Sequence, residues 1–126
     1  MARYLVICRT AYRATIEEQD DPGMWFARAM KNAGADVALL LQGDSVCYAV
    51  TGQDARGLAF GRRRVRGPDI PGDVRDIVEK GIPIHAVEED LSCRGIVTGN
   101  LVRGAKLVPR DKLAALVESF DRAFVF

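Results

Sequence analysis

The chain has 126 residues, with 18 basic and 17 acidic side chains for a formal net charge of +1, and 48% of its residues are hydrophobic. This charge balance argues against a nucleic-acid binder, which would present a strongly basic face, and no apolar run approaches the roughly 18 residues of a membrane span. We therefore expect one globular domain over residues 1–126. The short apolar run near the N-terminus does not fit a secretory signal, so a cytoplasmic location is expected.

The first half of the chain alternates apolar runs with helical patterns. Residues 4–8 and 36–42 are continuous apolar runs, as expected of strands that are covered on both faces. Between them, Asp21 and Pro22 fit the N-cap and the first residue of a helix. This order predicts a right-handed parallel crossover, and a short helix follows the second strand.

Residues 53–70 break the alternation, because they have five arginines, three glycines and no helical period. A loop of this length is usually functional, mobile or part of an interface. One interpretation is a solvated arm or an edge hairpin around residues 58–60. The other is contact with an anion or an acidic partner, since arginine side chains suit carboxylates and phosphates. The contact residues would then be Arg62, Arg63, Arg64 and Arg66.

Regular structure resumes with a helix that begins at Pro71 and leads to a buried strand over residues 82–87. A short strand is expected at 106–109, a helix over 110–121 and a closing strand at 123–126. Five strands interleaved with helices predict a single three-layer α/β/α domain with a mainly parallel five-stranded sheet.

This architecture gives the three cysteines a geometric meaning. In open parallel sheets, ligands and chemistry collect at the carboxyl ends of the strands. Cys8 ends the first strand, Cys47 lies in the first turns of the helix after the second, and Cys93 closely follows the strand at 82–87. We therefore expect all three toward one rim. Their odd number fits reduced thiols rather than a disulfide framework.

Each thiol has a structural and a chemical interpretation. Cys8 fits a small core residue, and Cys47 is either structural or, if exposed, a thiol near a helix N-terminus. Cys93 lies in a polar stretch where Arg94 would favour the thiolate and the carboxylates at 88–90 would oppose it. The sequence has no CxxC, HExxH or glycine-rich phosphate motif, so neither a metal nor a cofactor is expected.

Residues 82–96, I-P-I-H-A-V-E-E-D-L-S-C-R-G-I, resemble the signature of the DsrE/DsrF/DsrH-like sulfur-relay family. In that family a strand leads into an acidic or cysteine-bearing turn and then into Arg-Gly. Residues 38–46 are similar to the family's second strand and the helix after it, and residues 113–126 fit its closing helix and strand.

The resemblance implies an oligomer of like or related subunits that passes sulfane sulfur, as a cysteine persulfide, from a donor protein to an acceptor protein. It implies catalysis by Cys93 with Arg94. Supporting positions would be the turn residues Asp90 and Gly95 and the accessory thiols Cys8 and Cys47.

One departure from the family pattern leaves two alternatives open. In members with a reactive cysteine, the thiol lies near the place held here by Val87 or Asp90, whereas Cys93 comes later. The family also contains subunits without the thiol that act as assembly partners, so a non-catalytic scaffold subunit is the first alternative. A flavodoxin-like binder of a small anion at the same rim is the second.

Overall fold

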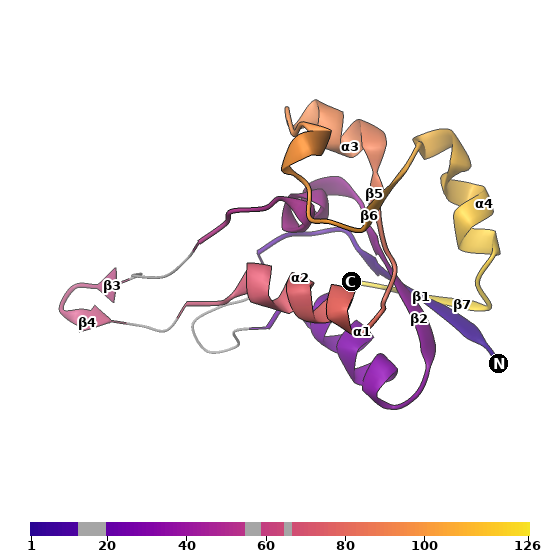
Figure 1. Cartoon of the computed structure of the whole chain (residues 1–126), viewed down its shortest axis with the longest axis horizontal. Helices are drawn as coiled ribbons and strands as arrows, with labels where there is room; N and C mark the ends of the chain where they lie inside the picture. Colours follow the sequence, from indigo (N-terminus) through magenta and orange to yellow (C-terminus); the bar gives the residue numbers. More distant parts are fainter. Residues whose placement is uncertain (13–19, 55–58, 65–66) are drawn as a thin grey trace.

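Five short strands, all parallel, form the centre of the structure (Figure 1). The computed structural model describes residues 1–12, 20–54, 59–64 and 67–126. The strand order across the sheet is β6-β5-β2-β1-β7. The strands are β1 (Arg3–Cys8), β2 (Asp36–Leu41), β5 (Ile84–Val87), β6 (Ala105–Val108) and β7 (Arg122–Val125). The α/β class is confirmed, and the sheet that was expected to be mainly parallel is parallel throughout.

Helices cover both faces of the sheet, but unequally. Successive residues of β1 and β2 point to opposite faces of the sheet, as the period of a strand requires. Val6 and Leu39 lie in the core under α1, α2, α3 and the 3-10 helix η1, whereas Leu5 and Leu40 face α4. The bounds are α1 (Pro22–Asn32), η1 (Gly43–Ala49), α2 (Ile70–Glu79), α3 (Glu88–Cys93), η2 (Thr98–Asn100), η3 (Arg110–Lys112) and α4 (Leu113–Glu118).

The closing helix is shorter than expected. The helix predicted over residues 110–121 is divided into η3 and α4, so that α4 has only six residues. It ends where the Ser119 hydroxyl donates a hydrogen bond to the Leu116 carbonyl at 2.6 Å. A serine that bonds nearby backbone competes with helix continuation, which accounts for the early end. None of the helices in the described part of the chain could cross a membrane.

The arginine-rich segment contains a two-stranded antiparallel hairpin that stands away from the main sheet (Figure 1). Its strands are β3 (Ala59–Phe60) and β4 (Arg63–Arg64), joined through Gly61 with a φ of 62° and the exposed Arg62. The side chains of Arg63 and Arg64, and the whole of Arg66, lie outside what the structure describes. The expected contact of these arginines with an anion or partner therefore stays a prediction.

A buried carboxylate fixes the start of α1. Asp21 is 2% exposed and accepts hydrogen bonds from the backbone N–H groups of Gly23 at 3.0 Å and Met24 at 3.3 Å, which confirms it as the N-cap. It also accepts a hydrogen bond from the Tyr48 hydroxyl at 2.6 Å. Because Tyr48 belongs to η1, this one carboxylate joins the segments that follow β1 and β2.

We predict that Asp21→Ala lowers the free energy of unfolding by about 2 kcal/mol, because it removes a helix cap and the acceptor of a buried hydroxyl. Urea denaturation measures the change. Asp36→Ala is the matched control, since Asp36 is exposed and its ion pair with Arg3 spans 3.7 Å. It should cost less than about 0.5 kcal/mol, and equal costs for the two variants would contradict the buried role of Asp21.

His85 gives the fold a pH dependence. It lies on β5 between Leu40 and Lys106 of the neighbouring strands, and burial, followed by the charge of Lys106, lowers its pKa below the usual value. The unfolded chain therefore binds a proton at His85 more readily than the folded chain. The stability that the neutral His85 allows is complete above the unfolded pKa of about 6.5. It is lost as the pH falls below that value, because protonation then favours the unfolded chain.

We expect the free energy of unfolding to decrease as the pH falls from about 7 to about 5, and His85→Gln to flatten that slope. Urea titrations at a series of pH values measure both. Lys106→Gln, which removes the second cause of the shift, should reduce the slope in part. Identical slopes in the wild type and His85→Gln would show that other groups control this pH range.

Candidate functional site

The carboxyl edge of the sheet brings together segments that are distant in the sequence. Because all five strands are parallel, the residues that follow β1, β2, β5 and β6 meet at one edge. These segments begin with Arg9, with η1, with α3 and with η3 respectively. The helix α3 starts directly after β5, where the turn with three acidic residues was predicted, and it carries those carboxylates in its first turn.

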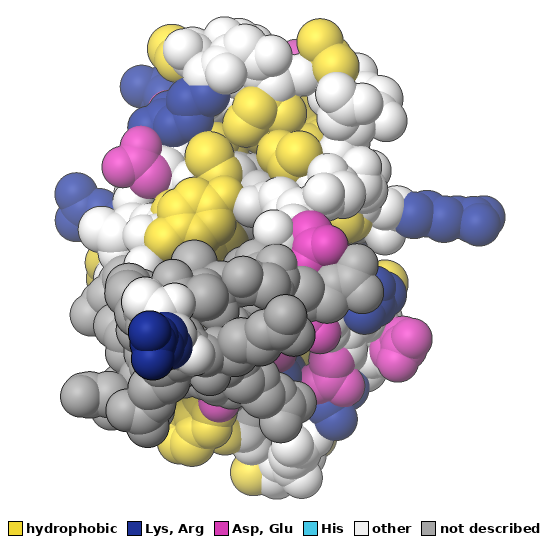
Figure 2. Space-filling model, turned by 90° about the vertical axis from the view of Figure 1, so that its left-hand side faces the viewer, with side chains coloured by type: hydrophobic (Ala, Val, Ile, Leu, Met, Phe, Trp, Pro, Cys, Tyr) yellow, Lys and Arg dark blue, Asp and Glu magenta, His cyan; other side chains and the backbone are white. Residues whose placement is uncertain are grey.

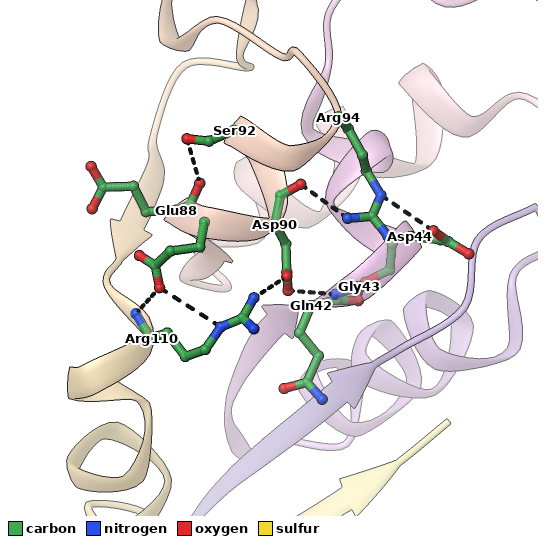
Figure 3. Close-up of polar contacts among 10 residues, drawn as sticks. Gln42, Gly43, Asp44, Glu88, Asp90, Ser92, Arg94 and Arg110 are labelled. Carbon is green, nitrogen blue, oxygen red and sulfur yellow. Dashed lines mark hydrogen bonds and ion pairs between the residues drawn. The ribbon is translucent and has the colours of Figure 1, made fainter.

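Asp90 connects three of these segments (Figure 3). Its Oδ2 accepts a hydrogen bond from the backbone N–H of Gly43 at 2.7 Å, and its Oδ1 is paired with the guanidinium of Arg110. Its side chain is only 15% exposed. The neighbouring Glu89 accepts a hydrogen bond from the backbone N–H of Arg110 at 2.6 Å. Asp90 therefore holds the segments after β2, β5 and β6 together through its contacts with Gly43 and Arg110.

Arg94 ties the end of α3 to η1. Its Nε and Nη2 donate to Oδ1 of Asp44, at 3.2 Å and 2.5 Å, and its Nη1 donates to the backbone carbonyl of Asp90 at 3.0 Å (Figure 3). The hydrogen bond with Asp44 is the main cause that raises the pKa of Arg94. The guanidinium predicted to assist Cys93 is thus engaged with η1.

Gly95 ends α3 in a conformation that favours glycine. Its φ is 67°, and the chain reverses there, with the Ile96 N–H donating to the Leu91 carbonyl at 3.0 Å. A residue with a Cβ would be strained at this φ. The Arg-Gly pair in the sequence therefore marks the end of α3.

A cleft of about 360 Å³ opens at the edge beside Asp90. Its floor is formed by the ends of β1, β2 and β5, and one wall is formed by η3 and α4. No cysteine is among the lining residues. They are Arg9, Gln42, Gly43, Val87, Asp90, Arg110 and Leu113.

The three thiols differ in access although all lie at or after the carboxyl ends of strands. Cys8 is 1% exposed and belongs to the core. Cys47 is half-buried in η1, and Cys93 is exposed at the last residue of α3. No group of residues suited to a metal ion occurs in the described part of the chain. All three cysteines lie toward the carboxyl edge of the sheet, as the sequence indicated. The Cys8 side chain, however, packs into the core.

Cys47 has polar neighbours that the sequence did not reveal. The Gln53 side chain donates to its backbone carbonyl at 2.7 Å. Burial raises the pKa of Tyr12, and the negative charge of a Cys47 thiolate adds to that shift. The same thiolate contributes to the raised pKa of Arg94. Cys47 therefore lies within electrostatic reach of both side chains.

Arg9 and Arg110 are the site residues that the motifs missed. Each follows a strand at the carboxyl edge, so the rule that located the cysteines applied equally to them. Asp44, the partner of Arg94, lies in the turn after β2 and had no motif to mark it.

Comparison with solved structures places the whole chain in one fold. The YchN protein from E. coli superposes with a TM-score of 0.76 at 21% identity, covering all of both chains. The chain has the YchN fold. A protein of unknown function from Methanobacterium thermoautotrophicum, MTH1491, also matches over both full lengths, with a TM-score of 0.67 and 13% identity. In sequence, no family model matches, and no curated protein does so either.

We predict that the Cys8 sulfur fills the space under α1. A Cβ added to Gly23 would lie 2.4 Å from Cys8 Sγ, so Gly23→Ala should lower the free energy of unfolding by about 1–3 kcal/mol. In Gly23→Ala/Cys8→Ala the sulfur is absent and the clash with it is removed. The double variant should therefore lose less free energy of unfolding than the two single variants lose together. Urea denaturation of all four proteins measures the coupling, and strictly additive costs would contradict this packing.

Proposed function

We propose that the protein carries sulfane sulfur as a persulfide on Cys93 and transfers it between a donor protein and an acceptor protein. One observation carries the proposal: Cys93 is the exposed thiol of the three, at the end of the helix that directly follows β5. A sulfur carrier has to meet the sulfur atom of another protein, and access is a requirement of thiol exchange. Cys8 is buried and does not meet that requirement.

The proposed chemistry is two successive exchanges. The Cys93 thiolate attacks the terminal sulfur of a donor persulfide, the donor thiolate leaves, and Cys93 holds the sulfur as Cys93-S-SH. An acceptor thiolate then attacks that terminal sulfur, and Cys93 leaves as a thiolate. Electrons balance in each step without an added oxidant, metal or cofactor. Arg94, adjacent in the chain, supplies a positive charge at this end of α3, and the half-buried Cys47 is an accessory thiol on the segment tied to it.

The resemblance of residues 82–96 to the DsrE/DsrF/DsrH-like family supports this proposal, and the fold shared with YchN is compatible with it. An oligomer of such subunits in the cytoplasm is part of the same proposal. Exposed apolar side chains are available for contact with another subunit. Figure 2 shows hydrophobic side chains gathered on the face seen from the hairpin end, beside charged side chains of both signs.

Asp90 favours a second candidate function, a partner subunit without chemistry of its own. At the place where related proteins are expected to carry the thiol, this chain has a carboxylate whose two oxygens are engaged by Gly43 and Arg110. Such a group holds the segments together and does not act as a nucleophile. In this role the rim and the hairpin with Arg62 would contact the catalytic partner.

The test is persulfidation by a sulfane donor, followed by intact-mass measurement. We expect wild type and Cys47→Ser to gain about 32 Da, the mass of one sulfur atom, and Cys93→Ser to gain none. Native thiol labelling should modify Cys93 faster than Cys47, with Cys8 slowest because it is buried. An adduct of the same yield in Cys93→Ser would exclude Cys93 as the carrier, and three slow thiols would favour the partner subunit.

A further inference from the structure

The cleft beside Asp90 has polar groups that the proposed sulfur transfer does not use. Arg9 and Gln42 line it at the ends of β1 and β2. Neither side chain has a hydrogen-bond or ion-pair partner within residues 1–12, 20–54, 59–64 and 67–126. In Figure 3 the Gln42 amide extends past Gly43 with no interaction drawn to it.

The other donors at the cleft already face carboxylates of the protein. The Gly43 N–H donates to Asp90, and the Arg110 guanidinium is paired with Asp90 and lies 3.7 Å from Glu89. The Asp90 carboxylate therefore occupies the place that a bound anion would take at these groups. What remains for a ligand is one guanidinium and one amide, which together match a single negative charge.

Two apolar side chains complete the cleft. Val87 is buried at the end of β5, and Leu113, at the start of α4, packs against the core of the second face. Leu113 is partly exposed and provides the apolar surface for a short hydrocarbon group. A volume of about 360 Å³ is at the lower end of the range for small-molecule sites.

We propose that this cleft binds a small organic monocarboxylate, with its carboxylate at Arg9 and Gln42 and its apolar body against Leu113. A phosphate fits less well, because its additional charge and oxygens call for more donors, and the nearest ones are held by Asp90. The proposal is independent of sulfur carriage, since no lining residue is a cysteine.

The experiment is an NMR titration of the full chain with acetate, butanoate and hexanoate, and separately with inorganic phosphate. We expect saturable amide shifts at Gln42, Gly43 and Val87, and a Kd that falls by about two- to fourfold for each added methylene. Phosphate should bind more weakly than hexanoate. Absence of saturable shifts at these amides, or tighter binding of phosphate than of hexanoate, would overturn the proposal.

A matched pair of variants tests the assigned donor. Arg9→Gln should weaken hexanoate binding by about tenfold, the expected loss of a charge-assisted hydrogen bond. Arg103→Gln removes an exposed arginine outside the cleft and should leave the Kd unchanged. Because the Arg9 side chain is exposed, its replacement should preserve the fold, which the amide spectrum of the unliganded variant checks. Equal affinities of Arg9→Gln and wild type would contradict the assignment.

Discussion

The carboxylate of Asp90 is the contact on which the arrangement of the carboxyl edge depends. It receives a hydrogen bond from Gly43 after β2 and pairs with Arg110 after β6, and it lies on the helix that follows β5. Without it the half-buried backbone N–H of Gly43 would lose its partner, and an unsatisfied group of this kind costs about 1–3 kcal/mol. One side chain thus sets the mutual positions of three segments that the sheet alone would only bring near one another.

Much of the fold could be predicted because local signals and tertiary structure agree. Continuous apolar runs located β1 and β2, and Asp21 before Pro22 located the start of α1. The division of the last helix into η3 and α4 was missed, since the helical pattern of apolar residues continues across both. Periodicity reports which residues face the core, and it does not report which backbone hydrogen bonds form.

The places of the candidate residues in the fold were predictable, and their contacts were less so. The parallel sheet places the thiols and Arg94 at or after the carboxyl ends of strands, as the sequence indicated. The pairing of Arg94 with Asp44, fifty residues away, depends on the packing of α3 against η1 and leaves no local pattern. For the same reason the cleft could not be foreseen, because it is a space between segments rather than a property of any one of them.

The shortness of α4 has a consequence for motion in this protein. Its six residues cover the second face of the sheet, and its first residue, Leu113, is also part of the cleft wall. Separation of α4 from the sheet would uncover Leu5 and Leu40 and widen the cleft in the same event. Short elements with few buried contacts open at a lower free energy than the rest of a domain. A molecule bound in the cleft against Leu113 would hold α4 on the sheet and oppose this opening.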